Sequence, residues 1–93
     1  MRYRTALGDV LREERLSKKL NLREVSSLGC IALGYLSEVE RGQKEISSEL
    51  LESVAVGLGV APHELVIKAG LRMASCDLPD TLEDLFDTAF SVV

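Results

Sequence analysis

Residues 21–42 read NLREVSSLGCIALGYLSEVERG, and this stretch predicts two short helices joined by a tight turn. Asn21 followed three residues later by Glu24 is typical of a capping box, in which each side chain accepts a hydrogen bond from the backbone amide of the other residue. Gly42 suits the left-handed position just past the end of the second helix. Because only residues 29–32 separate the helices, we expect them to cross steeply.

Helical spacing divides both predicted helices into an inward and an outward face. The first helix is expected to bury Val25 and Leu28 and to end near Gly29. In the second helix Leu36, Val39 and Glu40 share one side at about 100° per residue, and this side is expected to face the core. The outward arc then holds Gly34, Ser37, Glu38 and Arg41, with Leu33 at its border.

Helical patterns continue on both sides of this unit and predict an all-α fold. The expected elements are a helix that runs from the first apolar periodicity at Leu7 to about Lys19, one capped by Ser47 or Ser48 and closed by Gly59, and one that begins at Pro62 and stops at Gly70. Residues 1–70 would thus form one domain of five helices.

Residues 71–93 carry a separate pattern, in which a connector over 71–77 leads to an amphipathic helix with an acidic outer face. Its apolar stripe consists of Leu82, Leu85, Phe86, Ala89, Phe90 and Val93. A helix of about a dozen residues is marginal alone, so it needs a surface to cover its apolar side. We expect a dimerisation element that pairs with itself or packs on the last domain helix of a partner, and docking on its own domain is the alternative.

A charged pair is expected inside the domain. Arg15 lies four and eight residues after Leu11 and Leu7, which places it on their face and directs it toward the core. Glu40 is directed inward by the same reasoning. Two opposite charges aimed at one interior predict an ion pair, whose role is to orient the helix that carries Glu40 rather than to add much net stability.

The charge distribution leaves room for a nucleic-acid partner. The 93-residue chain has a formal net charge of −4, which taken whole disfavours contact with phosphates. Residues 1–70, however, hold ten basic and ten acidic side chains, and residues 71–93 hold one basic side chain against five acidic ones. The acidic excess therefore belongs to the tail, and a local basic surface on the domain is possible.

Other classes of function find little support in the sequence. The sequence has one histidine, no nucleophile with a base at recognisable spacing and no cluster with the spacing of metal ligands. These features argue against an enzyme, a metal site and a cofactor. Cys30 and Cys76 are expected to be free thiols. No stretch holds the roughly 18 to 20 apolar residues of a spanning helix, and no signal-peptide pattern opens the chain, so we expect a soluble cytoplasmic protein.

Residues 5–70 resemble the XRE-type, lambda-repressor-like helix-turn-helix family. The resemblance rests on the small Ser26, on Ile31 in the turn, and on YLSEVERG over residues 35–42. The combination LREVSS…LGYLSEVERGQKE is similar to the actinobacterial Clp gene regulator group, ClgR. The resemblance implies the same inward pairing of Arg15 with Glu40.

The resemblance implies a transcriptional regulator that binds double-stranded DNA as a homodimer on a near-palindromic operator. For the ClgR group it further implies activation of Clp protease and chaperone genes under stress, with RNA polymerase as a possible partner. An antitoxin-like protein-interaction module, with a toxin-binding tail on a helix-turn-helix body, is the alternative.

In the family the exposed half of the second helix of the motif lies in the major groove. Leu33 could then contact a thymine methyl group, Ser37 could bond several base edges, and Glu38 could accept from a cytosine amino group. Gly34 reads nothing itself but allows close approach. The expected phosphate contacts, which position the helix without reading sequence, are Arg23, Tyr35, Arg41, Gln43 and Lys44. For Leu33, packing at the domain edge is an equal alternative, and for Glu38 a solvated carboxylate is one.

Two residues depart from the family pattern around the turn. Cys30 occupies a position where the family often has glycine, although a residue other than glycine rarely adopts positive φ. Ala32 occupies the usual Ser or Thr cap before residue 33, a loss of about 1 kcal/mol. Both departures concern the turn and leave the predicted fold unchanged.

Overall fold

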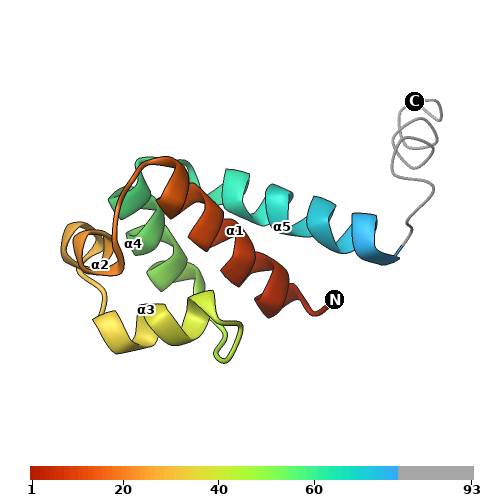
Figure 1. Ribbon diagram of the computed structural model, residues 1–93, viewed down its shortest axis with the longest axis horizontal. Helices are drawn as coiled ribbons and strands as arrows, with labels where there is room; N and C mark the ends of the chain where they lie inside the picture. Colours follow the sequence, from red (N-terminus) through yellow and green to blue (C-terminus); the bar gives the residue numbers. More distant parts are fainter. Residues whose placement is uncertain (78–93) are drawn as a thin grey trace.

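The computed structural model describes residues 1–77, which form five α-helices and, within that range, no strand (Figure 1). The helices are α1 (Tyr3–Ser17), α2 (Leu22–Gly29), α3 (Leu33–Glu40), α4 (Ser48–Leu58) and α5 (Pro62–Asp77). The predicted all-α, five-helix architecture is confirmed. The predicted C-terminal helix and its apolar stripe lie outside the described residues.

The start of α2 and both ends of α4 lie where the sequence predicts, whereas α1 already begins at Tyr3, before the predicted Leu7. The Asn21 side chain accepts from the Glu24 amide at 2.8 Å, and the Glu24 carboxylate accepts from the Asn21 amide at 3.0 Å. Ser47 caps α4 by accepting from the Leu50 amide at 3.2 Å. Gly59, with φ of 72°, closes α4 in the left-handed conformation that glycine adopts without steric cost.

The predicted end of α5 at Gly70 is wrong, because the helix continues without interruption to Asp77. The added turns run beside α1, where Met73 packs against the core and Arg72 forms an ion pair with Glu13. Tertiary contacts with α1 thus offset the roughly 0.5–1 kcal/mol cost of a glycine within a helix. The predicted connector over residues 71–77 is therefore helical, and a domain boundary after Gly70 would divide α5.

The prediction that α2 buries Leu28 is also wrong, since Leu28 is 59% exposed. Val25 is buried as expected, and the adjoining inward position belongs to Gly29. A Cβ atom on Gly29 would lie only 2.5 Å from the Ser53 carbonyl oxygen. This contact brings the α2 and α4 backbones so close that no larger side chain fits between them.

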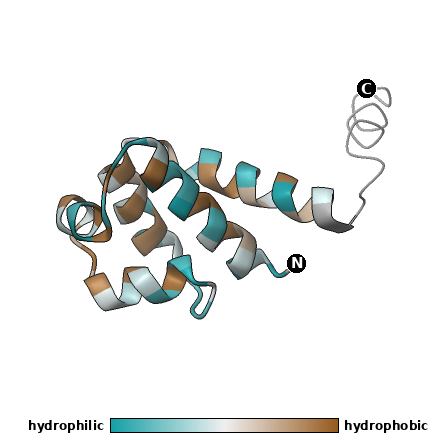
Figure 2. Ribbon diagram, viewed as in Figure 1, coloured by the Kyte–Doolittle hydropathy of each residue, from teal (hydrophilic) through white to brown (hydrophobic). Residues whose placement is uncertain are grey.

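The core is aliphatic, and Figure 2 shows the hydrophobic residues gathered on the facing sides of the helices. Its buried members are Ala6, Leu7, Val10, Leu11, Val25, Ile31, Leu36, Val39, Leu51, Val54, Ala55, Leu58, Leu65 and Ala69. Gly8 allows α1 to lie directly on α3, because a Cβ atom there would be 2.5 Å from the Val39 carbonyl oxygen. All five helices contribute to this one core.

Within residues 1–77 no single helix is both long enough and apolar enough to cross a membrane. The segments Ser48–Leu58 and Pro62–Ser75 reach the required length and composition only when taken together, and they are bent by 102° relative to each other.

Arg15 and Glu40 form the ion pair that helical spacing predicts, and it joins α1 to α3. The Arg15 Nε donates to Glu40 Oε2 at 2.9 Å, and Nη2 donates to Oε1 at 3.0 Å. A third donor, Nη1, bonds the Leu20 carbonyl oxygen at 3.1 Å. The two side chains are only 12% and 6% exposed, so both charges depend on each other for compensation.

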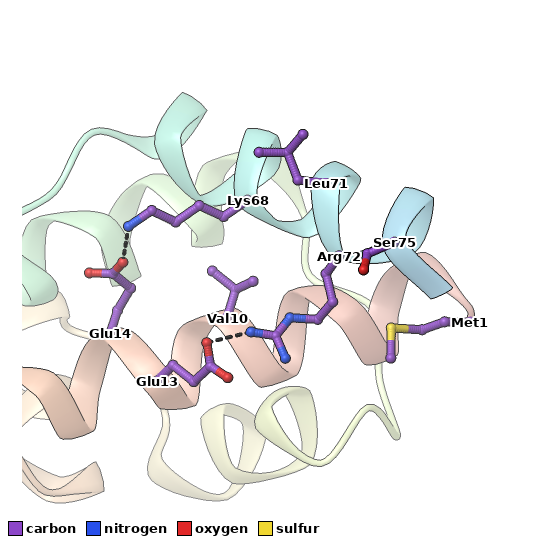
Figure 3. Close-up of a pocket in the computed structure, with 8 residues that line it drawn as sticks. All are labelled: Met1, Val10, Glu13, Glu14, Lys68, Leu71, Arg72 and Ser75. Carbon is purple, nitrogen blue, oxygen red and sulfur yellow. Dashed lines mark hydrogen bonds and ion pairs between the residues drawn. The ribbon is translucent and has the colours of Figure 1, made fainter. Parts of the chain in front are cut away.

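A second, more exposed set of ion pairs joins α1 to α5 along an open hollow that Val10, Leu71 and Ser75 also line (Figure 3). The hydrogen bond from Lys68 lowers the pKa of Glu14 and raises that of Lys68, and the hydrogen bond from Arg72 lowers the pKa of Glu13. At a pH above its ordinary pKa each ionised carboxylate therefore stabilises the folded state. This stabilisation is lost as the pH falls through the lowered pKa. Because water screens these pairs, they hold α5 in position more than they add stability.

We predict that Arg15→Ala lowers the free energy of unfolding by roughly 3–5 kcal/mol, because it leaves the Glu40 carboxylate buried and unpaired. Urea unfolding followed by circular dichroism measures this change. Lys68→Ala is the matched control, since it removes an exposed partner from the same helix pair and should change stability far less. Equal losses in the two variants would contradict the dependence of the fold on the buried pair.

Candidate nucleic-acid interface

The turn between α2 and α3 is held by backbone geometry and one side-chain bond. Cys30 has φ of 54°, so this cysteine adopts the left-handed conformation at the position where the family often has glycine. The Ser26 hydroxyl donates to the Ile31 carbonyl oxygen, and Ile31 itself is buried. Ala32 makes no side-chain cap, as expected. The buried Ile31 and the Ser26 bond therefore hold the entry to α3 in place of a cap.

The outer face of α3 is open, and its inner face is packed on α1 and α2 (Figure 1). Leu36, Val39 and Glu40 are buried, as the helical spacing predicts. Leu33, Gly34 and Arg41 are exposed. Ser37 and Glu38 are partly exposed. One side of a short helix thus offers a continuous contact surface.

The beginnings of α2 and α3 meet at an open hollow on this surface. Its lining residues are Asn21, Leu22, Arg23, Leu33, Gly34 and Ser37. The structure therefore brings together the candidate readers Leu33, Gly34 and Ser37 with Arg23, an exposed cation on the neighbouring helix. Gly34 has no heavy atom within 4 Å of the place where a Cβ would be, so nothing in residues 1–77 blocks approach to the helix at this point.

Residues 41–46 form a loop that folds back beside α3. Gly42 has φ of 73°, and a Cβ atom on it would lie 3.2 Å from Thr5, which is why the tight reversal requires glycine. The Gln43 amide donates to the Glu38 carbonyl oxygen at 2.9 Å, which ends α3. At the far side of the loop the Tyr35 hydroxyl donates to the Glu45 carbonyl oxygen at 2.6 Å. Tyr35, predicted to contact phosphate, therefore already uses its proton to hold the loop.

The loop places Lys44 against Glu38, an arrangement that the sequence reasoning missed. The Lys44 Nζ lies 3.1 Å from Glu38 Oε2, and the side chains are 58% and 34% exposed. A spacing of six residues is not a helical contact, so periodicity could not find the pair. The signal that could have done so is Gly42, because a left-handed residue at the helix end reverses the chain over the last turn.

The predicted DNA-contacting residues of the domain lie on α2, on α3 and in the loop after α3, and their environments differ. Arg23, Arg41, Gln43 and Lys44 are exposed, and Tyr35 is half-buried. Arg15 and Glu40 lie behind the outer face of α3 and support it. The predicted dimerisation residues Leu82, Leu85, Phe86, Ala89 and Phe90 lie outside the described residues. Residues 1–77 contain no group of three or more side chains able to hold a metal ion.

Known proteins are similar to this chain in both sequence and fold. A helix-turn-helix family pattern matches residues 11–65. The transcriptional regulator ClgR of Mycobacterium tuberculosis H37Rv is 51% identical over 71 residues, which are 76% of this chain and 63% of that protein. The HTH-type transcriptional regulator DdrOP3 of Deinococcus deserti is 38% identical over 60 residues, which are 64% of this chain and 46% of that protein. The chain thus spans less than two thirds of the length of these relatives.

Two crystal structures extend the likeness to three dimensions. The clp gene regulator ClgR of Corynebacterium glutamicum has a TM-score of 0.79 at 39% identity, over 96% of this chain and 95% of that chain. The restriction-modification controller protein C.AhdI of Aeromonas hydrophila has a TM-score of 0.65 at 32% identity, over 67% of this chain and 94% of that chain. The family pattern covers more than half of the residues. This chain therefore belongs to the helix-turn-helix family of the XRE type and is related to the ClgR regulators.

Proposed function

We propose that this protein is a sequence-specific DNA-binding transcriptional regulator, not an enzyme, and that it places α3 in the major groove. The observation that carries the proposal is the division of α3 into two faces. Its inner face is held by the buried Arg15–Glu40 pair, while its outer face is open and adjoins the exposed cation Arg23. A rigid helix with a free face is what reading of base edges requires.

The proposed contacts fall into two groups. Leu33, Ser37 and Glu38 face the bases, and Gly34 lets the helix approach them closely. Arg23 and Arg41 contact phosphates on the two sides of the groove, and Gln43 adds a polar contact. Phosphate contacts supply affinity and register, and base contacts supply specificity.

The biological role that we propose follows the relatives. The solved structure from Corynebacterium glutamicum is that of a clp gene regulator, and the Mycobacterium tuberculosis relative carries the name of the same regulator. We propose that this cytoplasmic protein activates Clp protease and chaperone genes under stress, with RNA polymerase as a partner. A homodimer on a near-palindromic operator fits this role, because one α3 contacts only a half-site.

Selection from random DNA duplexes tests the proposed function. We expect the full chain to enrich one motif. Its affinity for that motif should fall steeply between 50 and 200 mM salt, because each phosphate contact releases roughly one counterion. Arg41→Ala should reduce the slope of log affinity against log salt by about 0.9 and leave the motif unchanged. Enrichment of no motif would contradict sequence-specific regulation.

Gly34→Ala separates folding from DNA contact. The added methyl group meets no atom in the structure, so we expect the free energy of unfolding to stay the same or rise by up to about 1 kcal/mol. If α3 approaches the bases closely at Gly34, operator affinity should fall by about tenfold, as for a methyl group forced into a packed contact. Fluorescence anisotropy measures the affinity.

Gly70→Ala is the matched control for this experiment. Gly70 also has open space around it and lies within a helix, but on α5, away from the outer face of α3. We expect the same gain in stability with unchanged operator affinity. Unchanged affinity in Gly34→Ala would contradict close approach at this residue.

The proposed dimer can be tested by truncation after Asp77, the end of α5. We expect this shorter chain to keep its helical content, because the described core lies within residues 1–77, and to lose dimerisation, because the apolar stripe from Leu82 to Phe90 is removed. Light scattering gives the mass of both chains. A mass for the truncated chain still twice that of its monomer would place the dimer contact elsewhere.

A further inference from the structure

Glu38 and Lys44 both belong to the candidate interface, and they form an ion pair with each other. From the sequence each was expected to meet DNA by itself, the carboxylate as a base reader and the ammonium group as a phosphate contact. The distance of 3.1 Å between Lys44 Nζ and Glu38 Oε2 shows instead that the two opposite charges already lie beside each other.

The backbone around Lys44 is anchored on both sides, so the pair is a product of the fold. Before it, the Gln43 amide is bonded to the Glu38 carbonyl oxygen at 2.9 Å. After it, the Glu45 carbonyl oxygen accepts from the Tyr35 hydroxyl at 2.6 Å. The reversal at Gly42 is closed against Thr5. These contacts hold the Lys44 backbone beside the last turn of α3 and limit the reach of its side chain.

The pair also solves an electrostatic problem at the interface. Glu38 Oε2 is buried and has no hydrogen-bond partner of good geometry within residues 1–77, so the ammonium group of Lys44 supplies its compensation. DNA brings a dense array of negative phosphates to the same surface. An unpaired carboxylate there would be repelled, and the repulsion strengthens as water is excluded.

We propose that Lys44 is a positioning residue for Glu38: it stays paired with Oε2 in the DNA complex, neutralises the carboxylate, and leaves Oε1 to accept from a cytosine amino group. This inference rests on the proposed function and names the residue on which specificity at one base pair depends. It replaces the sequence-based role of Lys44 as an independent phosphate contact.

The two roles differ in whether the effects of the two substitutions on DNA affinity are additive. If Lys44 is an independent phosphate contact, its removal and the neutralisation of Glu38 act separately, and their effects add. If Lys44 serves Glu38, then removing Lys44 exposes the carboxylate to the phosphates, and neutralising Glu38 in the same chain relieves the damage. The salt dependence also differs, since a lysine that stays on Glu38 neutralises no phosphate.

The experiment is a double-variant cycle on the full chain with Glu38→Gln, Lys44→Met and both together, each bound to the duplex that the wild type selects. Glutamine keeps the shape of glutamate, and methionine keeps an apolar stem without the charge. We expect Lys44→Met to be the weakest binder and the double variant to recover affinity by about threefold or more, since coupled neighbours interact on this scale. Base preference at one position should be lost in the double variant.

Arg41→Met is the matched control. It removes an exposed cation from the same loop, and Glu38 is paired with Lys44 rather than with this arginine. It should reduce the salt slope by about 0.9, while the double variant keeps the wild-type slope. Lys44→Arg should retain the base preference, and melting curves by circular dichroism should show all variants folded.

Two results would overturn the inference alone: a double variant that binds no better than Lys44→Met, or one whose salt slope falls by about 0.9 as in Arg41→Met. Both require a wild-type chain that selects and binds a motif. A folded wild type that binds no duplex would overturn the proposed function and the inference with it, so the two failures are distinguishable.

Discussion

The buried ion pair between Arg15 and Glu40 is the constraint on which the interface depends. Each charge is compensated inside the protein by the other, so α3 can take only the rotation about its axis that keeps Glu40 against α1. That rotation directs Gly34 and Arg41 outward. The close approach of α1 and α3 at Gly8, where a side chain would strike the Val39 carbonyl oxygen, fixes the depth of the same contact. Replacing the pair with apolar residues could preserve stability, but it would remove this orientational constraint.

A second constraint comes from the loop after α3, where Gly42 reverses the chain and the Tyr35 hydroxyl holds its far side. The last turn of α3 and this loop are therefore joined by hydrogen bonds, and Glu38 and Lys44 face each other across them. This pairing bears on an apparent conflict, namely that a protein with net negative charge is proposed to bind negatively charged DNA. The net charge of −4 includes the tail, and within the interface the carboxylate of Glu38 has its own cation beside it.

Several features of the fold could be predicted because their causes are local. The capping box of Asn21 and Glu24, the Ser47 cap and the left-handed glycines at 42 and 59 all depend on hydrogen bonds or backbone conformations within a few residues. The inward faces of α1 and α3 could be predicted from period alone, since a helix directs every third or fourth residue to one side. The Arg15–Glu40 pair followed from two such periods that place opposite charges in one interior. The same argument identified the open face of α3.

Features that depend on contacts between distant segments could not be predicted in this way. Gly70 is a plausible helix end by local rules, but the contacts of Arg72 and Met73 beside α1 continue the helix past it. Leu28 fits an apolar pattern, yet Gly29 occupies the inward place because the α2 and α4 backbones meet there. The sequence by itself determined the helices, their caps and the two faces of α3, because these follow from hydrogen bonds and periodicity along the chain. Only the tertiary structure decided how far α5 runs and that Gly29 rather than Leu28 takes the inward place on α2, because both depend on contacts between segments far apart in the sequence. It also decided that Lys44 lies on Glu38, because the path of the loop depends on its contacts with Thr5 and Tyr35.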